Sequence, residues 1–174
     1  MSYLSQAMKR LEKLPLLEAH SYRVAKLAMD VAKSLRLPDP ASVAAAAYMH
    51  DLGKTTWPPE LFKKYALESK DWGIVKSHPI LGEEMAYGII PSRDVSNLVR
   101  GHHERPGGLG YPDKLQEPSV EMLVIAACNT FDHETNYREH RPEKMPVEFA
   151  LMQIAEYAPA KVVAALSGVL LNNN

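Results

Sequence analysis

Apolar residues recur along this chain at the three- and four-residue spacing that places them on one face of a helix. The segment 17–35 shows the pattern clearly, with one face formed by Val24, Leu27, Ala28, Val31 and Leu35. Strand-like alternation of apolar and polar residues, bounded by Asn-Gly or Asp-Gly turns, does not occur in the sequence. The pattern therefore predicts an all-α fold.

Prolines and glycines divide this pattern into separate helices joined by loops. We expect helices over about residues 3–13, 17–35, 41–49, 71–77, 80–89, 93–102, 120–134, 147–157 and 160–171. Two of these pieces are expected to meet at Pro79, because proline lacks a backbone N–H and disturbs a helix interior. The sequence contains no internal repeat and no linker, so residues 1–174 are expected to form a single compact helical domain.

Composition and charge exclude several classes of function. With 24% charged residues and a net charge of -1, the chain lacks the basic excess that binds duplex nucleic acid. A single cysteine, Cys128, rules out a disulfide framework and a cysteine-rich zinc site, which favours a reducing, cytoplasmic location. No run of about 18 apolar residues predicts a membrane span. A homodimer is compatible with these features.

Five of the seven histidines stand in short polar phrases, which are His20, His50-Asp51, His78 and His102-His103. Each phrase alone has an ordinary explanation, such as a helix cap or a helix entry, although adjacent histidines are harder to explain by packing. Imidazole nitrogen and carboxylate oxygen are the ligands that hydrolytic divalent metals prefer, and an aspartate can bridge two metals. Together the phrases indicate a metal centre that acts on a small phosphorylated substrate.

The same phrases carry a family resemblance. They read His20-Ser21-Tyr22-Arg23-Val24, His50-Asp51-Leu52-Gly53-Lys54, His78-Pro79, His102-His103-Glu104-Arg105 and Gly110-Tyr111-Pro112. In this order and spacing, over about residues 17–142, the chain resembles the HD superfamily of metal-dependent phosphohydrolases and is most similar to its HD-GYP branch. The resemblance implies a helical domain, hydrolysis of phosphoesters, and two divalent metal ions, iron or manganese, with zinc, nickel or magnesium as alternatives. Cyclic di-GMP is the characteristic substrate of that branch.

Carried over by position, the resemblance implies a ligand set. One metal would be held by His20, His50 and Asp51, and Asp51 would bridge to a second metal. The second metal would be held by His78, His102 and His103.

The resemblance also implies residues that contact the substrate. Lys54 would stabilise the phosphate charge as a catalytic residue beside Asp51, and Tyr111 would line the substrate mouth. Arg138 and Arg141 would contact phosphate, which suits their fork-shaped guanidinium groups. For each of these residues a solvated charge or plain loop packing is the competing explanation.

Three positions depart from the family pattern. Asn129 stands where the family has a metal-binding aspartate, and an amide oxygen is a weaker ligand without negative charge. Asp132 lies about 4.5 Å further along the helix and could replace that ligand only with a backbone shift, so a structural role fits it better. Residues 105–109 lack the family's acidic residue before Gly-Tyr-Pro. Leu16 occupies the position of a glutamate in trinuclear relatives, so a third metal is not expected.

Three functions follow as hypotheses. The first is a phosphodiesterase acting on a cyclic dinucleotide such as cyclic di-GMP, and the second is a phosphohydrolase acting on another nucleotide or phosphate ester. The third is a degenerate regulatory module that binds metal and ligand but turns over little. Asn129 favours the third, whereas the five histidines, Asp51 and Lys54 favour catalysis.

Overall fold

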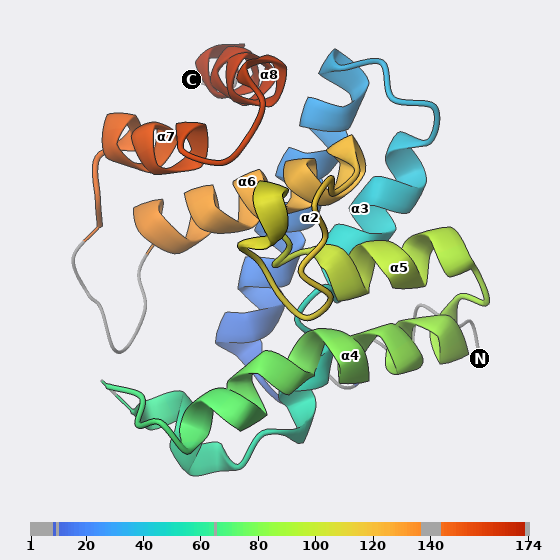
Figure 1. Cartoon of the computed structure of the whole chain (residues 1–174), viewed down its shortest axis with the longest axis vertical. Helices are drawn as coiled ribbons and strands as arrows, with labels where there is room; N and C mark the ends of the chain where they lie inside the picture. Colours follow the sequence, from blue (N-terminus) through green and yellow to red (C-terminus); the bar gives the residue numbers. More distant parts are fainter. Residues whose placement is uncertain (1–8, 10, 65, 137–143, 173–174) are drawn as a thin grey trace.

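The computed structural model describes residues 9, 11–64, 66–136 and 144–172, and all regular structure within them is helical (Figure 1). The α-helices are α2 (Pro15–Ser34), α3 (Pro40–Met49), α4 (Asp71–Ile89), α5 (Arg93–Gly101), α6 (Val120–Thr135), α7 (Val147–Ala155) and α8 (Ala160–Asn172). Short 3₁₀-helices are η1 (Leu52–Thr56), η2 (Pro59–Lys63) and η3 (Pro106–Gly108). The predicted all-α fold is confirmed, and most of the segment expected to be helical at 3–13 lies outside the described residues.

Helices α2, α3 and α6 form the centre of the domain, where α2 packs against both of the others. Small side chains allow this packing, since Ala28 of α2 and both Ala46 and Ala47 of α3 are completely buried. Burial of the larger apolar side chains around them supplies most of the stabilisation, at about 25 cal/mol per Å². The helical spacing in the sequence thus predicted the core-facing side of α2 correctly, since Val24 and Val31 are also completely buried.

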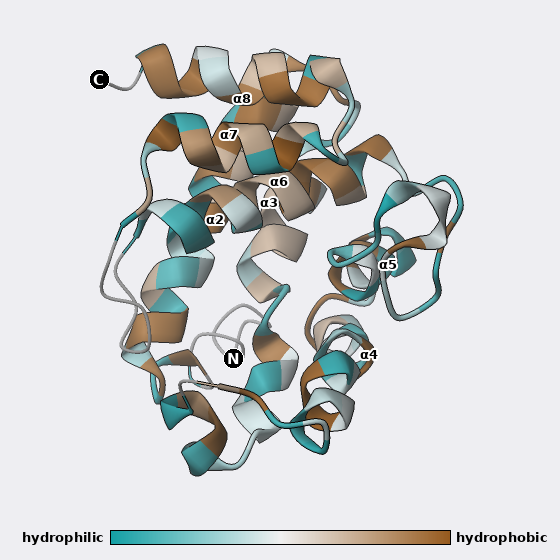
Figure 2. Ribbon diagram, turned by 60° about the vertical axis from the view of Figure 1, so that its left-hand side comes forward, coloured by the Kyte–Doolittle hydropathy of each residue, from teal (hydrophilic) through white to brown (hydrophobic). Residues whose placement is uncertain are grey.

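The remaining helices lie at opposite ends of this centre. Helices α7 and α8 are largely apolar and stack over α6 at one end, whereas α4 and α5 lie side by side toward the other (Figure 2). The 3₁₀-helix η1 connects the two parts because it follows α3 directly and packs against α4. In the described part of the chain, no helix has both the length and the apolar character needed to cross a membrane.

Helix α4 corrects one prediction from the sequence. It runs unbroken from Asp71 to Ile89 with Pro79 inside it, so the expectation of two pieces meeting at this proline was wrong. A proline in a helix interior is tolerated when the carbonyl that it leaves unpaired finds another donor. Here the carbonyl oxygen of Val75 lies 2.6 Å from the ring nitrogen Nδ1 of His78.

Candidate metal centre

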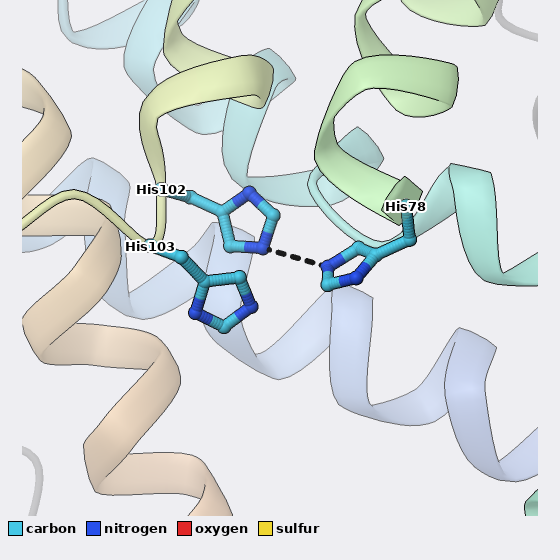
Figure 3. Close-up of side chains that lie close together, drawn as sticks. All are labelled: His78, His102 and His103. Atoms are coloured by element: carbon cyan, nitrogen blue, oxygen red, sulfur yellow. Dashed lines mark hydrogen bonds between the residues drawn. The ribbon is translucent and has the colours of Figure 1, made fainter. Parts of the chain in front are cut away.

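The predicted ligands come together in the interior of the domain, from four different helices. The potential ligand atoms within each of two groups lie within 4.8 Å of one another. One group consists of His20, His50 and Asp51, and the other of His78, His102 and His103. Figure 3 shows the three rings of the second group turned toward one another, with those of His102 and His103 at the end of α5 facing that of His78 in α4.

The carboxylate of Asp51 lies between the two groups. Its Oδ1 is 3.3 Å from Nε2 of His78 and 3.9 Å from Nε2 of His102. Its Oδ2 is 3.4 Å from Nε2 of His50 and 3.7 Å from Nε2 of His20. One oxygen therefore faces each group, which is the arrangement that a bridging aspartate needs.

Backbone carbonyls hold three of the histidine rings in the same way. Nδ1 of His50, His78 and His102 lies 2.6–2.7 Å from the carbonyl oxygen three residues earlier. A carbonyl can only accept a hydrogen bond, so Nδ1 of each ring carries a proton, which leaves Nε2 as the atom that can bind a metal. This is the usual way in which proteins fix the orientation and tautomer of a metal-binding histidine.

For His20, a carboxylate rather than a backbone carbonyl orients the ring. Nδ1 of His20 lies 2.6 Å from Oδ2 of Asp132, and Arg23 donates to both oxygens of the same carboxylate at 2.6 and 2.9 Å. Burial would raise the pKa of Asp132, but His20 and Arg23 outweigh it and lower the pKa to about 2. The ionised carboxylate only accepts, so Nδ1 of His20 donates and Nε2 faces His50 at 3.2 Å. Asp132 thus orients a candidate ligand.

The electrostatic surroundings keep the second histidine group neutral. Burial lowers the pKa of His78, and burial together with the neighbouring histidines lowers the pKa values of His102 and His103 further below the usual range. The Nε2 atoms of His78 and His102 are only 3.2 Å apart. Two lone pairs held so close together repel each other unless a cation lies between them, so the donor set fits a divalent metal.

Asp51 fits a metal for a second reason. The residue is completely buried, and within the described part of the chain its Oδ1 has no hydrogen-bond partner. Burial would raise the pKa of the carboxyl, but His50 and Lys54 outweigh it and hold the pKa well below its usual range. A buried, ionised oxygen without a donor is costly unless a cation compensates its charge.

Helix η1 places a lysine and a tryptophan beside this carboxylate. Side chains three residues apart lie above one another in a 3₁₀-helix, which brings Lys54 over Asp51 and Trp57 next to Lys54. Nζ of Lys54 donates to Oδ2 of Asp51 at 2.6 Å and lies 5.4 Å from the centre of the Trp57 ring. The Trp57 ring also contacts Phe62 and His78, with ring centres 5.4 and 5.7 Å away.

The loop after α5 brings Tyr111 onto the second histidine group. The Tyr111 ring stacks on His103 with centres 4.6 Å apart, and burial raises the pKa of its hydroxyl, which stays protonated at neutral pH. Glu104 ties this loop down, because its fully buried carboxylate accepts from the backbone N–H groups of residues 113–115 at 2.6–3.2 Å. A side chain at Gly110 would collide with the backbone of Glu104, so this close approach requires glycine.

A cavity of about 420 Å³ opens onto the centre. Its walls include the candidate ligands His20, His78 and His103. Apolar and aromatic side chains form much of the remaining wall, namely Leu16, Leu17, Trp57, Leu61, Phe62, Leu67 and Val75. Pockets of this size with apolar walls and a few polar groups are typical of small-molecule sites.

The remaining predicted residues differ in how far the structure locates them. Asn129 of α6 lines the same cavity, and its role as a ligand stays a prediction. Arg138 and Arg141 lie outside the described residues. Sequence reasoning assigned no role to Arg23 or Glu104, although both stand in the motifs. Arg23 stands three residues after a candidate ligand on the same helix face, which was a usable signal, whereas the backbone partners of Glu104 gave none.

Comparison with known proteins agrees with this geometry. Residues 17–157 match the HD domain family. The chain belongs to this family. The membership expected from the motifs is thereby confirmed, close to the HD-GYP branch.

Individual HD domain relatives are longer than this chain. The cyclic di-GMP phosphodiesterase PA4108 of Pseudomonas aeruginosa is 34% identical over 147 residues, which cover 79% of this chain and 34% of the relative. The 3'3'-cGAMP-specific phosphodiesterase 3 of Vibrio cholerae is 28% identical over 149 residues, which cover 83% of this chain and 32% of the relative. The chain thus spans about a third of the length of these curated relatives.

A solved HD domain has the same fold. The structure of the phosphodiesterase PgpH HD domain from L. monocytogenes aligns with a TM-score of 0.70 over 96% of both chains. Sequence identity is 16%, so this likeness supports the architecture alone.

Proposed function

We propose that this protein is a metal-dependent phosphodiesterase that hydrolyses a cyclic dinucleotide such as cyclic di-GMP. The observation that carries the proposal is the position of Asp51, whose two oxygens face two separate groups of histidines, and members of both groups line a cavity. Divalent ions held there, preferably iron or manganese, would neutralise the phosphate charge and activate water.

The chain's own residues supply the rest of the site. Asp51 and the five histidines would hold and orient the ions, with Asp132 fixing the ring of His20. Lys54 brings a positive charge to the cavity wall, where it would stabilise the charge of a bound phosphate. Tyr111 would present a protonated hydroxyl at the substrate mouth. Arg138 and Arg141 remain our predicted phosphate contacts.

The aromatic side chains in the cavity wall support a nucleotide substrate. Trp57 and Phe62 form part of one wall, and Tyr111 lines the cavity from another element. Flat aromatic surfaces stack well on nucleobases, at about 1–3 kcal/mol per base. A simple alkyl phosphate would leave these surfaces unused. The relatives named for cyclic di-GMP and 3'3'-cGAMP support the same substrate class.

A direct assay tests the proposal. The protein, supplied with manganese or ferrous iron, is incubated with cyclic di-GMP or 3'3'-cGAMP, and the products are separated by chromatography. We expect ring opening that stops when a chelator removes the metal and resumes when metal is restored. Turnover of bis-p-nitrophenyl phosphate without turnover of either cyclic dinucleotide would instead favour a phosphohydrolase for another nucleotide or phosphate ester. Activity that survives complete chelation would contradict the mechanism.

The second candidate function is a regulatory module that binds metal and ligand but turns over little, and Asn129 is the residue that favours it. If the amide occupies a ligand position, the ion held by His20 and His50 has lost an anionic ligand, while the other site keeps its three histidines. We then expect two sites of unequal affinity, with the His20 site filling last. The nearly isosteric change Asn129→Asp should tighten that site and raise activity. Metal titration of both proteins by calorimetry measures this, and equal sites in the wild type or no gain in the variant would place Asn129 outside the centre.

Location and assembly complete the proposal. The buried free thiol of Cys128 fits a reducing, cytoplasmic compartment. A homodimer is a further prediction, which the mass of the protein in solution would test.

A further inference from the structure

Helix α4 contains a carbonyl group that its own backbone does not satisfy. In a regular helix the carbonyl of Val75 would accept from the N–H of residue 79, but that residue is Pro79, which has no N–H. Nδ1 of His78 lies 2.6 Å from the Val75 oxygen and takes over this role. The side chain of a candidate metal ligand thus fills a gap that the adjacent proline creates.

The other two histidines held by carbonyls do not need a proline. His50 and His102 follow the last residues of α3 and α5, and their ring partners are Ala47 and Val99 in the final turns. The last four carbonyls of any helix lack intrahelical donors. His78 differs because it lies in the interior of α4, where every carbonyl would ordinarily be paired.

We propose that Pro79 is a positioning residue for His78. By keeping the Val75 carbonyl free of a backbone donor, it fixes the proton of His78 on Nδ1 and leaves Nε2 to face Asp51 and His102, at 3.3 and 3.2 Å. Pro79 thereby provides within a continuous helix what a helix end provides for the other two histidines. The inference rests on the proposed function in one respect, namely that Nε2 of His78 binds metal.

The substitution Pro79→Ala tests this inference through two effects of opposite sign. It supplies an N–H that competes with the His78 ring for the Val75 carbonyl. We expect the affinity for manganese to fall about tenfold, the usual effect of losing a partner that orients a ligand. We expect the thermal midpoint of the metal-free protein to rise, because alanine is much better than proline in a helix interior. A purely structural proline would not weaken metal binding in a more stable protein.

Nitrogen NMR of the histidine rings gives a readout that needs neither metal nor activity. In the metal-free wild type, His78 should show a single tautomer protonated at Nδ1, and Pro79→Ala should show a mixture. Pro79→Ser supplies the same N–H with a different side chain and should behave alike. The matched control is Pro40→Ala, in the first turn of α3, where no interior carbonyl depends on the proline. It should leave both manganese affinity and the His78 tautomer unchanged.

The outcomes separate the inference from the proposed function. If the wild type binds neither manganese nor ferrous iron, the proposed function fails, while the tautomer of His78 in Pro79→Ala still tests the role of the proline. An unchanged tautomer in both Pro79 variants overturns the inference. So does a loss of manganese affinity that merely parallels a loss of stability.

Discussion

Replacing Asp51 with alanine is expected to remove bound metal and phosphodiesterase activity together. Each carboxylate oxygen faces a different histidine group, so the substitution deprives both groups of the anionic ligand that we propose they share. Loss of one stabilising group at a reaction centre commonly lowers the rate by about 10²–10³-fold. We expect a reduction of at least that order, measured as kcat on a cyclic dinucleotide, with elemental analysis showing the metal lost.

The control for this variant is an aspartate outside the centre. Asp39 caps α3 through the backbone N–H of Ser42 at 3.0 Å. Asp39→Ala should lower the stability slightly through loss of the cap but keep metal and activity. Wild-type metal content in Asp51→Ala would show that our ligand assignment is wrong.

Replacing Gly53 with alanine is expected to destabilise the domain severely. A Cβ at this position would overlap the backbone oxygen of His78 and come within 2.9 Å of the Gly82 nitrogen. Backbone atoms cannot move aside as a flexible side chain can, so η1 and α4 must separate. We expect a loss of about 2–3 kcal/mol in the free energy of unfolding. For a chain of this length that corresponds to a fall in Tm of about 5–10 °C.

Helix α4, which packs against η1, offers a control glycine. A Cβ at Gly88 of α4 would meet nothing within 4 Å, so Gly88→Ala should be neutral or stabilise by up to about 1 kcal/mol. Chemical denaturation of both variants in chelator measures the difference without any contribution from metal. Metal affinity should also fall in Gly53→Ala, since the contact between η1 and α4 sets the position of Asp51 relative to His78. Equal stability of the two variants would contradict the predicted close packing.

Much of the fold and of the candidate site could be predicted from the sequence. The three- and four-residue apolar spacing predicted the helices of the core, because burying one face of each helix is the main source of stability. The histidine and aspartate phrases indicated a metal centre when taken together, and the family resemblance that their order carries implied which residues would be ligands. These conclusions depend on local chemistry and on order along the chain, which a sequence displays directly.

Other features depended on contacts between distant segments. Asp132 and His20 are 112 positions apart in the sequence, and only the packing of α2 against α6 brings them together. The resulting hydrogen bond supports an orienting role for Asp132 rather than a role as a metal ligand. Similarly, Glu104 stabilises the loop after α5 by accepting hydrogen bonds from backbone N–H groups that only the folded loop brings close to it. Pro79 was predicted to interrupt a helix, because the sequence shows that proline lacks the N–H that a helix interior needs. The sequence does not show that the ring of His78 satisfies the carbonyl left unpaired. The tertiary structure thus decided where hydrogen bonds go, since their geometry depends on distances that sequence order does not contain.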